Sequence, residues 1–113
     1  MKDISKSIQY KDKTYSLVFN LNVMQSIQAE YGSMDNWAKL TDASEPDARA
    51  VIFGITEMIN EGIDIANDDR PEKEPFLTMK QVGRLITDVG LTGMTQTLQE
   101  AVIDSTRSDS KNE

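Results

Sequence analysis

The segment DIANDD at positions 64–69 carries oxygen-bearing side chains that could bind calcium. Carboxylate and amide oxygens are the ligands that this hard cation prefers. An EF-hand loop places them at alternate positions, with a glycine at the sixth and a glutamate at the twelfth. Arg70 and Pro71 stand where such a loop should turn. The sequence therefore argues against a metal site, and we expect neither a metal nor a cofactor.

Glu57 and Glu61 are a second candidate, because their spacing places two carboxylates on one helical face. The rest of the chain gives such a pair no support, since its 113 residues contain no histidine, no cysteine and no glycine-rich phosphate loop. These absences exclude thiolate nucleophiles, serine–histidine relays and histidine-ligated zinc. We therefore expect solvated surface charges here, no catalytic residue, no small-molecule substrate, and a binding protein rather than an enzyme.

Five internal methionines are the third chemically distinctive feature. Methionine is flexible and polarisable, so it fills irregular gaps in cores and also recurs on surfaces that adapt to apolar partners. Core filling is the commoner use, and a partner groove is the alternative that the sequence leaves open. The residues are Met24, Met34, Met58, Met79 and Met94.

The charge pattern limits the choice of partner. The net charge is −7, and residues 20–77 hold twelve acidic side chains against four basic ones. An acidic chain is a poor ligand for nucleic acid, which is bound through Lys and Arg. No apolar run approaches the roughly 20 residues of a membrane helix, and residues 1–10 lack the apolar region of a signal peptide. We therefore expect a soluble, intracellular protein that binds neither nucleic acid nor membranes.

Hydrophobic periodicity predicts the elements that position these side chains. Residues 5–19 alternate apolar and polar side chains around a polar connection at 11–13, which predicts a β-hairpin. From Asn20, a suitable N-cap, the period becomes helical, and it stops at Gly32. A short helix is expected after Ser33, from apolar residues spaced three apart.

The middle of the chain predicts a long helix with an exposed loop after it. Ser44 precedes a proline and an acidic residue, which is typical of a helix start with a capping serine. An apolar stripe at helical spacing follows. Gly62 either ends this helix or weakens it, and in the second case Ile63 and Ile65 extend it by one further turn. Residues 67–75 are charged and proline-containing, so they predict an exposed loop.

Two more helices complete the predicted domain. Thr78 begins a capping box, and the helix that it opens stops at Gly90. The last helix is expected from about Thr92. The predicted fold is mainly α, with an N-terminal β-hairpin followed by a compact bundle of about four to five helices. It forms one domain over residues 1–104, and a polar tail at 105–113 is expected to be disordered.

Three segments share their apolar spacing and their Gly and Asn positions with a known protein family. They are KTYSLVFNLNVMQSIQAEYG at 13–32, DARAVIFGITEMINEGIDIAN at 47–67 and LTMKQVGRLITDVGL at 77–91. In this combination the chain resembles the small tail assembly chaperones of long-tailed bacteriophages and prophages. The likeness covers most of the chain outside its first residues and its tail, and none of the segments is a catalytic motif.

The resemblance implies a non-structural protein that acts in the host bacterial cytoplasm and is absent from the mature virion. Such proteins are thought to bind and solubilise the aggregation-prone tape-measure protein and to help recruit tail-tube subunits. The resemblance also implies possible self-association. A longer product of a translational frameshift is a further expectation, with its extension beginning near residues 105–113.

A chaperone of this kind needs an apolar groove for one face of a partner helix. The candidates are apolar residues that lie off the main helical stripes or at helix ends. The alternative for each of them is that it completes the core. They are Ile63, Ile65, Phe76, Leu91 and Met94.

A function of another class is the alternative to the chaperone. Small acidic phage-encoded inhibitors occupy a nucleic-acid-binding cleft of a host protein and present carboxylates in place of phosphates. The acidic segment 20–77 would be the relevant surface. Arg49, Arg70 and Lys73 interrupt it, which weighs against a continuous acidic ridge.

Overall fold

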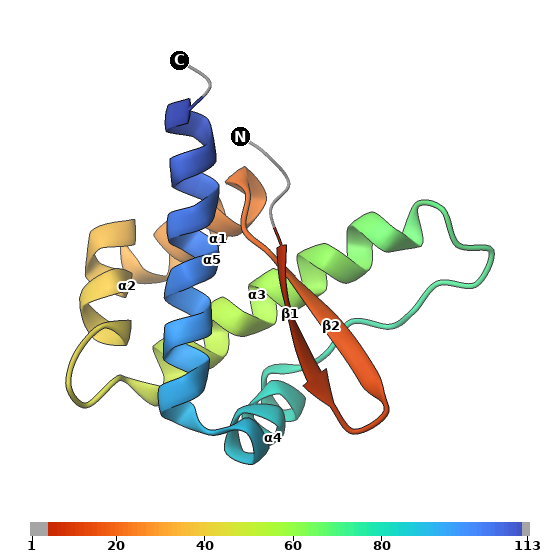
Figure 1. Cartoon of the computed structure of the whole chain (residues 1–113), viewed down its shortest axis with the longest axis horizontal. Helices are drawn as coiled ribbons and strands as arrows, with labels where there is room; N and C mark the ends of the chain where they lie inside the picture. The colour runs from red at the N-terminus through yellow and green to blue at the C-terminus, as the bar shows by residue number, and fades with distance from the viewer. Residues whose placement is uncertain (1–4, 112–113) are drawn as a thin grey trace.

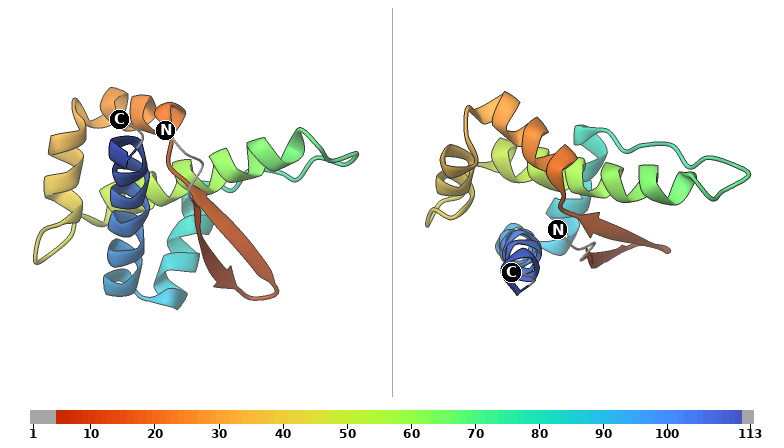
Figure 2. Two further views of the ribbon diagram at one scale, coloured as in Figure 1. Left: turned by 45° about the horizontal axis from the view of Figure 1, so that its top comes forward. Right: turned by 90° about the horizontal axis from the view of Figure 1, so that it is seen from above.

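The computed structural model describes residues 5–111 and confirms the predicted fold, an N-terminal β-hairpin followed by a helical bundle (Figure 1). α3 is the central element, because β2 and each of the other helices in the described part pack against it (Figure 2). The strands are β1 (Ser5–Tyr10) and β2 (Lys13–Val18), and the helices are α1 (Leu21–Tyr31), α2 (Met34–Thr41), α3 (Ala48–Asn67), α4 (Met79–Val89) and α5 (Leu91–Lys111).

The hairpin is antiparallel, and its strands are joined by the two residues Lys11 and Asp12. Alternate side chains of both strands share one face, as the sequence predicted. Ile8 and Leu17 are buried on that face, while Ser7 and Ser16 are exposed on the other. Val18, on the other face of β2, is also buried and lies next to Gly62 of α3, the helix with which β2 makes its main contact.

Local capping sets most helix ends at the predicted residues. The side chains of Asn20, Ser33 and Thr78 each accept a hydrogen bond from the backbone N–H three residues later, at 3.2, 3.0 and 3.1 Å. Gly32 and Gly90 follow α1 and α4 with φ of 88° and 109°. Glycine adopts this region without steric cost, which is why both positions end a helix.

The start of α3 differs from the prediction. Its N-cap is Asp47, whose side chain accepts a hydrogen bond from Ala50 N at 2.9 Å, and not Ser44. Asp47 N also donates to Leu40 O at 2.9 Å, which ties the preceding turn to the end of α2. This tertiary hydrogen bond selects the later of two residues that are both suitable caps.

Gly62 neither ends nor interrupts α3, which continues to Asn67. A Cβ at position 62 would lie 2.9 Å from the backbone O of Ser16 on β2. The glycine therefore allows the hairpin to lie directly on the helix, a close approach that a side chain would prevent.

The last helix begins where predicted but is longer at its C-terminal end. α5 begins at Leu91, one residue from the expected start, and continues to Lys111, where the sequence predicted a disordered tail from residue 105. Glycine and proline are absent between positions 94 and 111, so the polar composition of this stretch does not break the helical backbone. Residues 112–113 of the predicted tail lie outside the described part.

The loop after α3 leaves the end of the helix and then returns beside it (Figure 1). Two asparagine side chains of α3 bind the backbone of the returning loop segment. Asn67 donates to Glu74 O at 3.0 Å and accepts from Glu74 N at 2.9 Å. Asn60 donates to Leu77 O and accepts from Leu77 N, both at 2.9 Å. We call these two reciprocal pairs the asparagine clamps, and they make the predicted loop an ordered strap on α3.

An ion-pair cluster joins the same loop to the hairpin. Glu74 accepts hydrogen bonds from Lys13 Nζ at 3.1 Å and from Arg70, and these bonds lower the pKa of Glu74 below its ordinary value of 4.5. A carboxyl group with a lowered folded-state pKa stabilises the protein above its unfolded pKa, and this contribution is lost as the pH falls through the folded pKa. The cluster should therefore lose its effect on acidification.

We expect the urea midpoint to fall when the pH is lowered from 7 to below 4.5, the ordinary pKa of Glu74. Glu74→Gln should be less stable than the native chain at pH 7 and should show a smaller drop on acidification. Equal drops for the two proteins would mean that the cluster contributes nothing and that other carboxyl groups cause the acid sensitivity.

Candidate functional site

An apolar groove lies between the first half of α3 and α4, and it reaches the start of α5. Its volume is about 320 Å³. None of its lining side chains is charged, which is notable in a chain where 27% of residues are charged. We call it the α3–α4 groove, and it is lined by Ala48, Ile52, Gly83, Ile86, Thr87 and Leu91.

Helical spacing explains why these residues meet. Ala48 and Ile52 are one turn apart on α3, and Gly83 and Thr87 are one turn apart on α4. At the floor, a Cβ added to Gly83 would lie 3.6 Å from Ile52 Cδ1, an ordinary contact distance. The groove is therefore open partly because residue 83 has no side chain.

The junction between α4 and α5 forms one end of the groove. Gly90 N donates to Ile86 O at 2.7 Å and closes α4, and α5 begins at the next residue. This tight connection places Leu91 in the groove lining, with 37% of its surface exposed, beside Val89 at 43%. Leu91 thus leaves a large apolar side chain partly in solvent at this end of the groove.

Two of the five predicted partner-binding residues belong to the core. Ile63 is 7% exposed and Met94 is 1% exposed, so neither side chain is accessible to a partner. Continuation of α3 past Gly62 turns Ile63 inward, and Met94 lies one turn before buried Leu98 on α5. For these two residues the structure supports the alternative stated above, that they complete the core.

The other three predicted residues are exposed but do not form one site. Leu91 lies in the α3–α4 groove, and Ile65 is 41% exposed near the end of α3. Phe76 is 55% exposed and lines a separate depression beside α1. The sequence did not point to Gly83 or Ile52 as groove residues, because the groove exists only where α3 and α4 meet.

The depression beside α1 is polar and holds the carboxylate pair considered above. Its lining includes Glu57, Glu61 and Asp64 from α3 together with Phe76. Glu61 Oε2 accepts hydrogen bonds from Asn20 Nδ2 at 2.7 Å and from Asn22 Nδ2 at 3.1 Å. Glu61 is therefore held in a contact between α3 and the start of α1, and it does not form a carboxylate–carboxylate pair with Glu57.

Four of the five internal methionines pack with the core, and none of the five lines the α3–α4 groove. Met58 and Met94 are buried, and Met24 and Met34 are half-buried against the core. Met79 is half-buried at the start of α4. The α3–α4 groove itself is made of aliphatic side chains, a threonine and a glycine.

Two further features of the described part bear on the site. Within residues 5–111, no helix combines the length and apolar character needed to cross a membrane. The same stretch brings no three Asp, Glu, His or Cys side chains into an arrangement that could hold a metal ion. The side chain of Asn67, from the calcium-like segment, is engaged in an asparagine clamp.

Comparison of the chain with protein-family models, curated proteins and solved structures gives no match.

Proposed function

We propose that this protein is a non-structural tail assembly chaperone of a long-tailed bacteriophage or prophage. In this proposal it binds and solubilises the tape-measure protein, helps to recruit tail-tube subunits, and acts in the host cytoplasm without entering the mature virion. The observation that carries the proposal is the α3–α4 groove, an uncharged apolar surface on an otherwise acidic chain. The resemblance of the three segments described above supplies the class of partner.

The physical argument concerns how a long apolar helix is kept in solution. A partner helix can place one apolar face in a groove through side chains at i, i+3 and i+4. Ile52 and Ile86 offer the apolar contact surface, and the partly exposed Leu91 extends it into solvent. A net charge of −7 on the chaperone keeps the resulting complex from associating further.

The direct test is co-expression with the product of the longest reading frame just downstream in the source genome. We expect more of that long protein to stay soluble and the two proteins to co-elute at high salt, because apolar contacts are not screened. Failure to raise its solubility, with this protein folded, would contradict the proposal. Co-elution that is lost at high salt would favour the acidic inhibitor instead.

A variant in the groove should separate binding from folding. We expect Leu91→Asp to reduce capture of the long protein by about tenfold or more, because it places a charge in an apolar contact. Leu91 is already partly exposed, so the far-ultraviolet circular dichroism should not change. Capture at the native level would exclude the groove as the binding surface.

Substitution of Ile65 or Phe76 by a charged residue is the matched comparison for Leu91→Asp. The sequence-based prediction is that these substitutions also weaken capture while the fold is kept, and their exposure makes them safe for folding. Because both residues lie outside the α3–α4 groove, we expect smaller effects than for Leu91→Asp. Larger effects at Phe76 would move the binding surface to the depression beside α1.

A further inference from the structure

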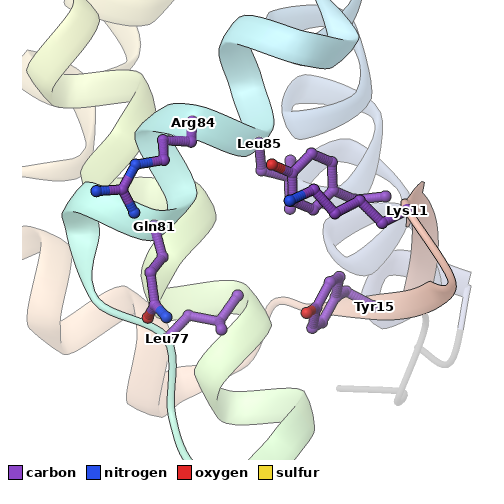
Figure 3. A pocket seen from close by; sticks show the side chains of 7 residues that line it. Lys11, Tyr15, Leu77, Gln81, Arg84 and Leu85 are labelled. Atoms are coloured by element: carbon purple, nitrogen blue, oxygen red, sulfur yellow. The ribbon is translucent and has the colours of Figure 1, made fainter.

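Another pocket lies on the opposite side of α4 from the α3–α4 groove, between that helix and the turn of the hairpin (Figure 3). Its volume is about 180 Å³. α4 contributes Gln81, Arg84 and Leu85, which share a helical face that does not include Gly83 or Thr87. We call it the hairpin pocket, and it is lined by Tyr10, Lys11, Tyr15, Leu77, Gln81, Arg84 and Leu85.

The charge in this pocket is opposite to that of the whole chain. Its lining contains Lys11 and Arg84 and no acidic side chain, although the net charge of the protein is −7. Among the described residues, neither cation forms an ion pair. Gln81 Oε1 accepts the capping hydrogen bond from Thr78 N, so its amide NH₂ is left to donate. The polar groups of the pocket are therefore suited to an anion.

The backbone at Lys11 is a second, independent observation. Lys11 has φ of 56°, and it is the only non-glycine residue in the described part with positive φ. A two-residue hairpin turn with positive φ at its first position normally has glycine there. The ammonium group of Lys11 lies 5.3 Å from the centre of the Tyr10 ring. Figure 3 shows the Lys11 side chain at the edge of the pocket. Strain of this kind is typically kept where a side chain is needed for function.

The size and the apolar floor of the hairpin pocket limit the class of ligand that fits it. Pockets for cofactors and drug-sized molecules have volumes of about 300–1,000 Å³, so one of 180 Å³ admits only one or two side chains. Leu77 and Leu85 and the two tyrosine rings give it an apolar floor and walls. The complementary ligand is thus a carboxylate next to an aliphatic group, which an acidic residue beside a leucine or isoleucine would supply.

We propose that the hairpin pocket binds an acidic side chain of a partner polypeptide, with a neighbouring aliphatic side chain against Leu77 and Leu85. The positive charges of Lys11 and Arg84, which lie on different sides of the pocket in Figure 3, favour an acidic residue. This site is separate from the α3–α4 groove, so it does not depend on the proposed chaperone function.

The test uses the isolated protein and two capped peptides, acetyl-Ala-Leu-Glu-Leu-Ala-amide and the same peptide with Gln in place of Glu. We expect saturable chemical-shift changes at the Arg84 side chain and the Tyr10 and Tyr15 rings with the Glu peptide. The Gln peptide should bind about tenfold more weakly, because it lacks the charge-assisted hydrogen bond. Equal binding of the two peptides would overturn the proposal.

Three variants test whether Lys11 and Arg84 are the cations that bind the Glu peptide. Arg84→Gln and Lys11→Gly should each abolish the difference between the two peptides. Lys11→Gly should also raise the melting temperature, since glycine relieves the positive φ, so its loss of binding would not reflect unfolding. Lys39→Gln removes the same charge from α2, far from the pocket lining, and should leave binding unchanged. Native binding by Arg84→Gln or Lys11→Gly would contradict the assignment of these cations.

Two further controls identify the source of the carboxylate. Acetate at the same concentration should not reproduce the shifts, because it lacks the aliphatic neighbour, and if it does, the site is not one for a polypeptide. Sedimentation of the native protein should show no association that Lys11→Gly removes. Association sensitive to Lys11→Gly would mean that a second copy of this acidic chain occupies the pocket, which would replace the proposed partner.

Discussion

Gly54→Ala is expected to lower the free energy of unfolding by about 1–3 kcal/mol, the usual cost of overpacking a core. A Cβ at position 54 would lie 2.5 Å from Trp37 Cζ2 and 3.2 Å from Leu98 Cδ1. The indole cannot move away without loss, because its Nε1 donates to Ala50 O at 3.0 Å and the side chain is 2% exposed. Packing therefore outweighs the gain of about 0.5–1 kcal/mol that alanine normally brings to a helix interior.

Gly83→Ala is the matched control, because it is the same substitution within a helix. Its Cβ would meet Ile52 Cδ1 at 3.6 Å, so we expect a gain of up to about 1 kcal/mol instead of a loss. Urea unfolding followed by the fluorescence of the single tryptophan gives both values. Equal effects of the two substitutions would mean that Trp37 does not pack against Gly54.

The number and order of the elements could be predicted because their signals are local. Asn20, Ser33 and Thr78 cap the helices that follow them through hydrogen bonds to backbone N–H groups three residues away. The predicted N-cap of α3 was wrong, because Ser44 and Asp47 are equally suitable caps by sequence. The hydrogen bond from Asp47 N to Leu40 O of α2 favours Asp47. A helix boundary that is set by a tertiary contact cannot be predicted from the hydrophobic periodicity of one segment.

The same reasoning explains what could be predicted about the site. For Ile65, Phe76 and Leu91 the sequence left open whether they are exposed or complete the core, and the structure shows all three exposed. The sequence left burial of Ile63 open, because Gly62 could either end the helix or only weaken it, and the structure shows that α3 continues and buries Ile63. The α3–α4 groove joins segments more than thirty residues apart in sequence and depends on an absent side chain at Gly83, so no local pattern announces it.

The second large effect on stability is expected from loss of an asparagine clamp. We expect Asn67→Ala to lower the free energy of unfolding by about 2–3 kcal/mol, because it removes two hydrogen bonds and leaves the backbone N–H and C=O of Glu74 without these partners. Asn36→Ala is the matched control, since that exposed amide makes a single side-chain bond to the backbone O of Tyr31, and it should cost less than about 1 kcal/mol. Equal losses would contradict the clamp.

Amide hydrogen exchange can show whether the two clamps act together. Asn60 and Asn67 stand seven residues apart on α3 and hold Glu74 and Leu77 of one continuous strap. If the strap detaches as a unit, Asn67→Ala should speed exchange at Leu77 N–H as well as at Glu74 N–H. The double substitution should then cost less than the sum of the single ones, because the second clamp is already weakened when the first is lost. Additive losses, with Leu77 exchange unchanged by Asn67→Ala, would instead make each clamp an independent attachment.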